Sequence, residues 1–288
     1  MATHIPTATP AAPGPARRSR PANNLARSTL TRTSGIGLGV TMLWFSLLVL
    51  IPLVAVIITA STGGWSAFVN QLNNEQTAAA IWLTIRTALV VTLINVLIGT
   101  VIAWVLVRDR FWGKGLLEVI IDIPFALPTI VAGLVLLSLY GTESPLGLHW
   151  ANTSMSVYLA LAFVTLPFVV RMVQPVLEDL DADVEEAAAS LGASRFTIFW
   201  RIILPSLAPA IAAGAALSFA RGMGEYGSLV LLSGNLPFKS EVASVRILSA
   251  IENDNPEGAA AIAAMLLLVS LLVIVILDLI QRRMVRRG

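Results

Sequence analysis

Long stretches without a single charged residue constrain this chain more than any other feature. They cover residues 33–74, 87–107, 123–142, 202–220 and 258–277. Each is long enough to supply the ~20 apolar residues that cross a ~30 Å hydrocarbon core as a helix. The strands of a membrane barrel would instead alternate over ~10 residues, and these stretches do not alternate. Only 12% of the residues are charged, against roughly 25% in soluble domains, so the sequence predicts a polytopic helical membrane protein.

Six transmembrane helices account for the apolar segments of this all-α integral membrane protein. We predict them at residues 37–60, 81–107, 116–140, 155–175, 207–232 and 258–280. Residues 1–36 are rich in Pro, Ala, Thr and Arg and contain no acidic residue, so they are predicted to form a disordered basic tail. Residues 37–288 then form the membrane domain. Six spans place both termini on one side, which also receives most of the 19 basic residues, and the positive-inside rule makes that side cytoplasmic.

The amino-acid composition and motifs of the chain argue against catalysis or cofactor binding by this subunit. It contains no cysteine, and its two histidines, His4 and His149, have no partner at metal-ligand spacing, so no metal site is predicted. The one Gly-Lys-Gly sequence, 113–115, lacks the first glycine and the Ser/Thr of a phosphate-binding loop. We therefore expect no bound cofactor, no enzymatic activity and no nucleic-acid partner, with any ATP and Mg²⁺ bound by another subunit.

A polar loop at about 178–205 separates the fourth and fifth predicted spans. Asp183 is predicted to cap a helix, with Glu186 three residues later in the arrangement of a capping box. One face of this helix carries small and apolar side chains at i, i+3, i+4 and i+7, namely Val184, Ala187, Ala188 and Leu191. Gly192 supplies a positive φ that ends the helix.

A second short helix is predicted to follow within the same loop. Ser194 can cap its start, and Pro205 is predicted to end it before the fifth span. Two short helices joined at a glycine form a compact surface element whose alanines permit close approach of a partner. The alternative is an amphipathic helix that lies at the membrane surface without a partner.

The spacing within this loop resembles a known family. The order is Glu-Ala-Ala, three residues, Gly, nine residues, Ile, one residue, Leu-Pro, matched by Glu186, Ala187, Ala188, Gly192, Ile202, Leu204 and Pro205. It resembles the signature loop of the permease subunits of bacterial ABC importers. The resemblance implies the type I permease fold and a coupling helix that docks, with Leu191 included, into a cleft of a separate ATP-hydrolysing subunit.

Four further segments narrow the resemblance. Residues 122–128, 166–177 and 219–228 are similar to sulfate/thiosulfate permeases, and residues 233–241 resemble the T-type subunit of that pair. The resemblance implies an ATPase dimer, a second permease subunit and a periplasmic or lipid-anchored sulfate-binding protein, all at a bacterial inner membrane. Molybdate and tungstate permeases share a similar segment in the fifth span, so they remain an alternative. An ATPase-independent anion transporter or channel, or a membrane anchor for a soluble partner, are alternatives of another class.

Three arginines fall inside predicted spans, where a charge costs ~2.5–3.5 kcal/mol on insertion scales. Arg221 is predicted near the middle of the fifth span, with Glu225 four residues later on the same face. The pair either neutralises itself to stabilise packing or lends positive potential to a path for anions. Arg86, near the outer end of the second span, either anchors at the headgroups or meets the incoming anion. Arg171 is predicted to reach the headgroups from the fourth span.

Small residues and prolines mark two further helices. A small residue occurs at every fourth position of the fifth span, at Ala210, Gly214, Ser218 and Gly222. Such a stripe lets helices approach closely inside a membrane. We expect this stripe to face another helix, including one from the second permease. Pro124 and Pro128 are predicted to bend the third span.

Overall fold

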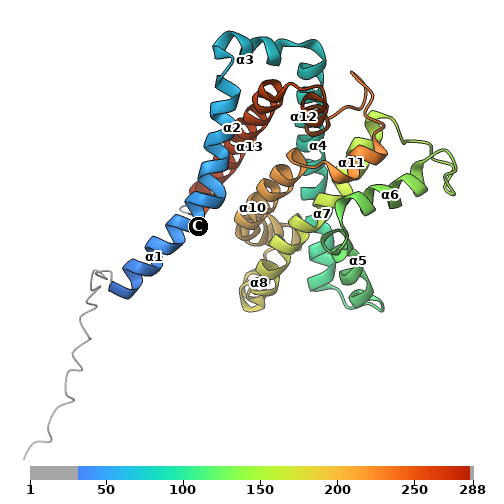
Figure 1. The fold of residues 1–288 in the computed structure, drawn as a ribbon. Helices are drawn as coiled ribbons and strands as arrows, with labels where there is room; N and C mark the ends of the chain where they lie inside the picture. Colours follow the sequence, from blue (N-terminus) through green and yellow to red (C-terminus); the bar gives the residue numbers. More distant parts are fainter. Residues whose placement is uncertain (1–31, 286–288) are drawn as a thin grey trace, which may run out of the picture. The chain divides into compact units, whose positions relative to one another are not determined.

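The computed structural model describes residues 32–285, and the regular elements in that range are all helical (Figure 1). Residues 1–31, most of the predicted basic tail, lie outside the described residues. The chain divides into two compact units, residues 1–51 and 52–288. In the first unit the described part consists of α1 (Arg32–Phe45) and the π-helical turn η1 (Ser46–Leu50). α1 therefore begins four residues before the end of the range predicted to be disordered.

The second unit contains the remaining helices. They are α2 (Ile51–Ser61), α3 (Gly64–Asn73), α4 (Glu75–Arg108), α5 (Lys114–Ala126), α6 (Thr129–Tyr140), α7 (Ser154–Glu178), α8 (Ala182–Ser190), α9 (Arg195–Ile198), the π-helical turn η2 (Phe199–Ile203), α10 (Leu204–Met223), α11 (Gly227–Leu232), α12 (Ala243–Glu252) and α13 (Pro256–Val285). α5 and α8 lie at one end of this unit and α3 and α12 at the opposite end (Figure 1). We call these the α8 end and the α12 end.

Five helical runs in the described part of the chain are long and apolar enough to cross a membrane. They are Ser34–Ser61, Glu75–Arg108, Ser154–Glu178, Arg195–Met223 and Pro256–Arg283. Each overlaps one of the predicted spans, and four of the six predicted spans are confirmed as continuous helices. The fifth span differs at its end, because α10 stops at Met223 and a separate short helix, α11, covers most of the remainder up to Leu232.

The third predicted span is broken rather than bent. α5 and α6 meet at 117°, and Leu127 between them is extended, with φ −85° and ψ 135°. Pro128 explains the break, because a proline disfavours the helical conformation of the residue before it and has no N–H to donate. Pro124, in contrast, lies inside α5.

The broken pair still carries the chain from one end of the unit to the other. Five residues separate the end of α4 from the start of α5, and the last residue of α4 contacts α8. The first residue of α7, Ser154, shares a pocket with Trp82 and Arg86 from the N-terminal half of α4, so α7 begins at the α12 end. Counting the broken pair as one span gives six spans in the described residues.

α4, α7 and α10 pack against one another along their length and form two apolar cores. The core nearer the α12 end contains Leu161, Phe219 and Ile262. The core nearer the α8 end contains Leu106, Val173 and Leu207. Between them, the Asn95 side-chain amide donates to the Thr165 hydroxyl over 2.9 Å, a polar contact of the kind that joins helices within a membrane.

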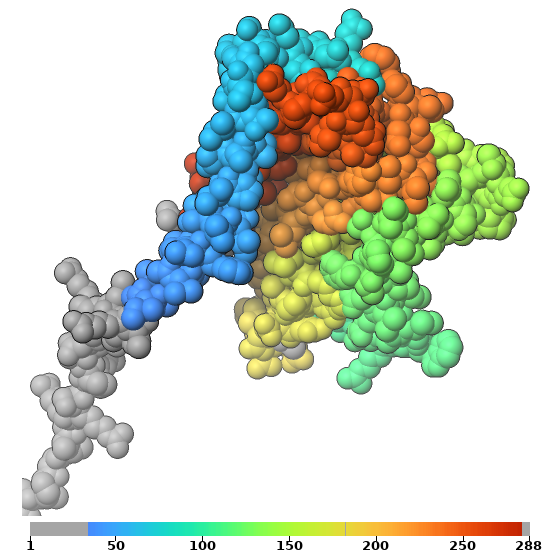
Figure 2. Space-filling view, in the orientation of Figure 1, coloured from blue at the N-terminus to red at the C-terminus, as the bar shows by residue number. Residues whose placement is uncertain are grey.

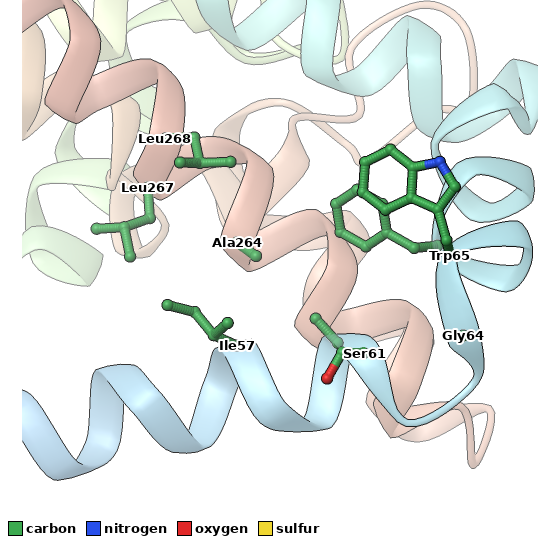
Figure 3. A pocket seen from close by; sticks show the side chains of 9 residues that line it. Ile57, Ser61, Gly64, Trp65, Ala264, Leu267 and Leu268 are labelled. Atoms are coloured by element: carbon green, nitrogen blue, oxygen red, sulfur yellow. The ribbon is translucent and has the colours of Figure 1, made fainter.

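The outer surface of α4 shows how the unit meets lipid. Large apolar side chains are exposed along one face of the helix, at Leu89, Leu93, Leu97 and Val101. Such a stripe is unfavourable in water and suits the hydrocarbon core of a bilayer. Near the start of α13, an apolar pocket of about 250 Å³ lies among α2, α3 and α13 and is lined by Ile57, Trp65 and Leu268 among others (Figure 3).

Candidate functional site

α8 begins with a cap two residues earlier in the sequence than predicted. The Asp181 carboxylate accepts a hydrogen bond from the Asp183 N–H over 3.0 Å. Asp181 has the extended backbone of an N-cap residue, with φ −66° and ψ 117°. The prediction that Asp183 caps the helix is therefore wrong, because the acidic run offers an earlier carboxylate in the required conformation.

α8 ends at Gly192 as the sequence predicts. Gly192 has φ +85°, and its N–H donates to the Ala189 carbonyl over 2.9 Å. The next N–H, at Ala193, donates to the Ala188 carbonyl over 3.0 Å. These two bonds form a Schellman motif, which satisfies the last carbonyls of the helix and requires the left-handed conformation that glycine adopts without strain.

The second helix of the loop begins as predicted but does not end at Pro205. The Ser194 hydroxyl accepts from the Thr197 N–H over 3.2 Å and caps α9. α9 then continues through η2 into α10, so Arg195–Met223 is one helical run. Pro205 falls in the first turn of α10, where a missing N–H is tolerated, and the π-turn just before it shifts the hydrogen-bond pattern. The loop is therefore rigidly joined to a membrane-spanning helix.

The loop protrudes at the α8 end (Figure 2), and several of its apolar side chains are exposed. Leu191 is 89% exposed, Phe196 71% and Trp200 52%. Glu186 and Ala187 are also exposed, and Ala188 is half-buried. Of the last motif residues, Ile202 and Leu204 are half-buried and Pro205 is exposed. Exposed aromatic and aliphatic side chains around a short, well-capped helix have the character of a protein-docking surface.

The last turn of α4 holds this loop in place through contacts that the sequence did not reveal. The Arg108 guanidinium forms an ion pair with the Glu185 carboxylate of α8, and it lies 5.6 Å from the centre of the Trp104 ring. Trp104 in turn makes an edge-to-face contact with Phe199 of η2, at 5.7 Å between ring centres. α4 therefore contacts both halves of the loop. Glu185 is adjacent to the motif, but nothing in the sequence pairs it with a residue 77 positions away.

Arg221 and Glu225 lie where α10 ends. The predicted position of Arg221 near mid-span is wrong, since it is in the last turn of α10. One of its terminal nitrogens lies 2.6 Å from Glu225 Oε2. Glu225 Oε1 accepts from the Ser228 N–H over 2.9 Å and from the Ser228 hydroxyl over 2.8 Å. The Glu225 side chain is 1% exposed and that of Arg221 33%, so a buried carboxylate joins the end of α10 to the start of α11.

Two helix breaks meet beside this ion pair. A Cβ on Gly227, at the start of α11, would lie 2.1 Å from the Thr129 hydroxyl oxygen at the start of α6. A Cβ on Gly133 would lie 2.7 Å from the Ser228 carbonyl oxygen. α6 and α11 therefore touch through their backbones. Interrupted membrane helices place polar backbone groups inside a bundle, and such places often line substrate paths.

The small-residue stripe of α10 is covered within this chain. Ala210, Gly214, Ser218 and Gly222 are all buried. A Cβ on Gly214 would lie 3.0 Å from the Val169 Cα of α7, and one on Gly222 would lie 3.6 Å from the Ala88 Cβ of α4. The stripe is therefore the contact between α10 and two helices of the same chain, and the expectation that it also faces a second permease is wrong.

The other two arginines differ from each other. Arg171 donates through Nε to Asp122 Oδ1 over 2.8 Å and through a terminal nitrogen to Gln174 Oε1 over 2.8 Å. It thus joins α7 to α5 instead of reaching for headgroups alone. Arg86 is exposed on α4 and lines a pocket at the α12 end with Lys239.

A family model described as "Binding-protein-dependent transport system inner membrane component" matches residues 95–287. The chain belongs to this family. A sulfate transport system permease protein CysT from Synechocystis sp. is 40% identical over 271 residues, which cover 92% of this chain and 95% of that protein. CysT from Salmonella typhimurium is 40% identical over 259 residues, covering 88% and 94%.

Solved structures agree with the family at the level of the fold. A bacterial ABC transporter involved in the import of the acidic polysaccharide alginate matches with a TM-score of 0.72 and 16% identity, over 86% of this chain and 94% of that chain. This member of the transport-system family is therefore an integral membrane permease subunit with an ABC-importer fold. It is a transport component and not an enzyme.

Proposed function

We propose that this chain is a permease subunit of an ATP-driven importer of sulfate or thiosulfate and forms half of its translocation pathway. The observation that supports this most directly is the capped, exposed α8 loop in a chain that is 40% identical to CysT sulfate permeases. A second permease subunit completes the pathway. A periplasmic or lipid-anchored sulfate-binding protein delivers the anion.

α8 and its surroundings dock the separate ATPase subunit. Leu191 and Phe196 offer apolar contact area, and Glu186 offers a charge free of partners among the described residues. ATP and Mg²⁺ are bound by that ATPase and not by this chain. Because α9, η2 and α10 form one continuous helix, a displacement of the docked loop moves α10 as a rigid lever between two states of the pathway.

The α8 end is the cytoplasmic side in this proposal. Six spans place both termini there, together with most of the basic residues of the chain, as the positive-inside rule requires. The α12 end then faces the binding protein.

Arg221, Glu225 and Arg86 contribute to the anion path. Arg221 is one-third exposed beside two helix breaks, and its planar guanidinium suits a tetrahedral oxyanion. Glu225 holds Arg221 in one orientation through the ion pair. The contact with the anion must be weak, since a path has to release what it binds.

The test is uptake of labelled sulfate by the complex reconstituted with its ATPase, second permease and binding protein. We expect uptake that requires ATP and that an equimolar concentration of molybdate does not suppress. If molybdate is preferred, the substrate assignment fails. If sulfate moves at the same rate without the ATPase, the chain is an independent transporter or channel.

A further inference from the structure

A pocket of about 300 Å³ opens at the α12 end, apart from the Arg221 site. α4 contributes Trp82 and Arg86, α7 contributes its first residue Ser154, and the segment between α11 and α12 contributes Phe238, Lys239 and Glu241. The pocket is therefore built from three parts of the chain that are distant in sequence. The sequence offered Arg86 as a candidate but gave no indication of Lys239.

The two cations of this pocket have no partner. Within residues 32–285, neither Arg86 nor Lys239 takes part in an ion pair or side-chain hydrogen bond. Glu241 does not neutralise them, because its own partners lie elsewhere. It is buried, its Oε2 accepts from the Gln76 amide over 2.7 Å, and its Oε1 lies 4.0 Å from an Arg246 nitrogen. The pocket therefore keeps an excess of positive charge.

The segment that carries Lys239 is held in a fixed conformation. The Ser240 hydroxyl donates to the Ser233 carbonyl, and the Lys239 and Glu241 N–H groups both donate to the Leu236 carbonyl, over 3.1 and 3.0 Å. Phe238 has φ +61° although it is bulky and 67% exposed. A non-glycine residue in this region is strained, and such strain persists where the surrounding structure fixes it, often at binding sites.

We propose that this pocket binds the free tetrahedral oxyanion before it enters the pathway, with Arg86 and Lys239 as its charged ligands. This assignment rests on the proposed function. The Ser154 hydroxyl, which has no partner among the described residues, supplies a third donor. Trp82 and Phe238 also line the pocket. Two cations near each other repel, and a doubly charged anion relieves that repulsion.

Trp82 makes binding directly measurable. The complete complex in uncharged maltoside micelles is titrated with sodium sulfate at constant ionic strength, and the signal assigned to the pocket is the fluorescence change that Trp82→Phe removes. We expect a saturable change in the parent complex and none in Arg86→Gln/Lys239→Gln. Arg110→Gln, which removes an exposed cation near the α8 end, is the matched control and should respond like the parent. A sulfate response that survives the double substitution overturns the proposal.

Uptake kinetics provide the second measurement. The KM for sulfate should rise roughly tenfold in the double variant, within the range that focused charge contributes to capture, while the maximal rate stays near that of the parent. Lys239→Gln alone changes one exposed side chain and should show part of the effect, so a folding defect cannot explain it. An unchanged KM in both variants contradicts the proposal.

The phosphate of a lipid headgroup is also a tetrahedral oxyanion, so its binding to the pocket must be tested in a separate experiment. The titration is repeated in nanodiscs of phosphatidylcholine and of phosphatidylglycerol. A Trp82 response to phosphatidylglycerol that sulfate neither produces nor displaces would assign the pocket to a headgroup and overturn the proposal. Failure of the parent complex to import sulfate would instead refute the proposed function, whatever Trp82 reports.

Discussion

Two arginines near the α8 end and two cations near the α12 end differ in their partners. At the α8 end, Arg108 reaches Glu185 on another helix, and Arg171 reaches Asp122 on another helix. At the α12 end, Arg86 and Lys239 share a pocket and have no such partner in the described part of the chain. Arg221 is intermediate, since it is paired with Glu225 four residues away on its own segment.

This difference separates two uses of charge. An ion pair between helices fixes their relative position, which suits a region that transmits movement from a docked partner. An unpaired cation in a pocket is free to meet a ligand, which suits a region where an anion arrives. The predictions below test this division, beginning with the pair that belongs to neither class.

Removing Arg221 should have the largest effect on stability. Arg221→Ala leaves the Glu225 carboxylate, 1% exposed, without its cation. Breaking a buried pair costs ~3–5 kcal/mol, and we expect a value near the lower limit because Arg221 is partly exposed. The thermal midpoint of the purified complex should fall accordingly. The double variant Arg221→Gln/Glu225→Gln should recover much of the loss, because it leaves no buried charge. An unchanged midpoint in Arg221→Ala would show that the pair does not support the fold.

The contact between α6 and α11 should be the next most sensitive feature. In Gly227→Ala the new Cβ would lie 2.1 Å from the Thr129 hydroxyl oxygen and 3.0 Å from the Ile130 nitrogen. Overpacking of this kind costs ~1–3 kcal/mol, and the whole membrane domain should melt earlier. Thr129→Ala should relieve part of the effect in the double variant, since the contact with the Ile130 nitrogen remains. Equal melting of Gly227→Ala and the parent would show that the two helix breaks are loosely packed.

Gly192 should behave in the opposite way to Gly227. A Cβ on Gly192 meets no atom within 4 Å, but its φ is +85°, so Gly192→Ala costs ~1–2 kcal/mol through backbone strain alone. The loss should be confined to the α8 loop, leaving the melting of the membrane domain unchanged while ATPase co-purification and uptake decline. Gly192→Asn should be milder, because asparagine tolerates the left-handed region. A normal amount of bound ATPase in Gly192→Ala would contradict the role of this turn.

Whether a feature could be predicted from the sequence depends mainly on how far apart in the chain the interacting residues are. The spans, the stop at Gly192 and the cap at Ser194 depend on neighbouring residues, and each was predicted. The cap of α8 at Asp181 was missed because several acidic residues compete within a few positions. Pro205 was expected to end a helix, but the π-turn before it places the proline where no donor is needed.

Several other features that sequence reasoning missed depend on residues far apart in the chain. The partners Arg108 and Glu185 are 77 residues apart, and Arg86 and Lys239 belong to elements on opposite sides of α7 in sequence. The small-residue stripe of α10 was visible in the sequence, but only the fold shows that α7 and α4 cover it. The same limit applies to Arg221, whose depth depended on where α10 ends.

The Arg108–Glu185 pair offers the smallest but most specific test of the division between the two ends. Both side chains are about one-quarter exposed (25% and 23%), so the pair should add ~1 kcal/mol or less to stability. Its effect should appear in the coupling of ATP hydrolysis to sulfate transport, because the pair fixes α8 against α4. Mutations between coupled sites change the coupling by ~0.5–2 kcal/mol, so Arg108→Gln should lower sulfate transported per ATP hydrolysed several-fold without lowering ATP hydrolysis. The exchange Arg108→Glu/Glu185→Arg should restore part of the amount of sulfate transported per ATP. The control is Arg110→Gln, two residues further on and exposed, which should leave that amount unchanged. If Arg108→Gln keeps the parent ratio, the continuous α9–η2–α10 helix alone carries movement from the docked loop, and the paired charges of the α8 end only support the fold.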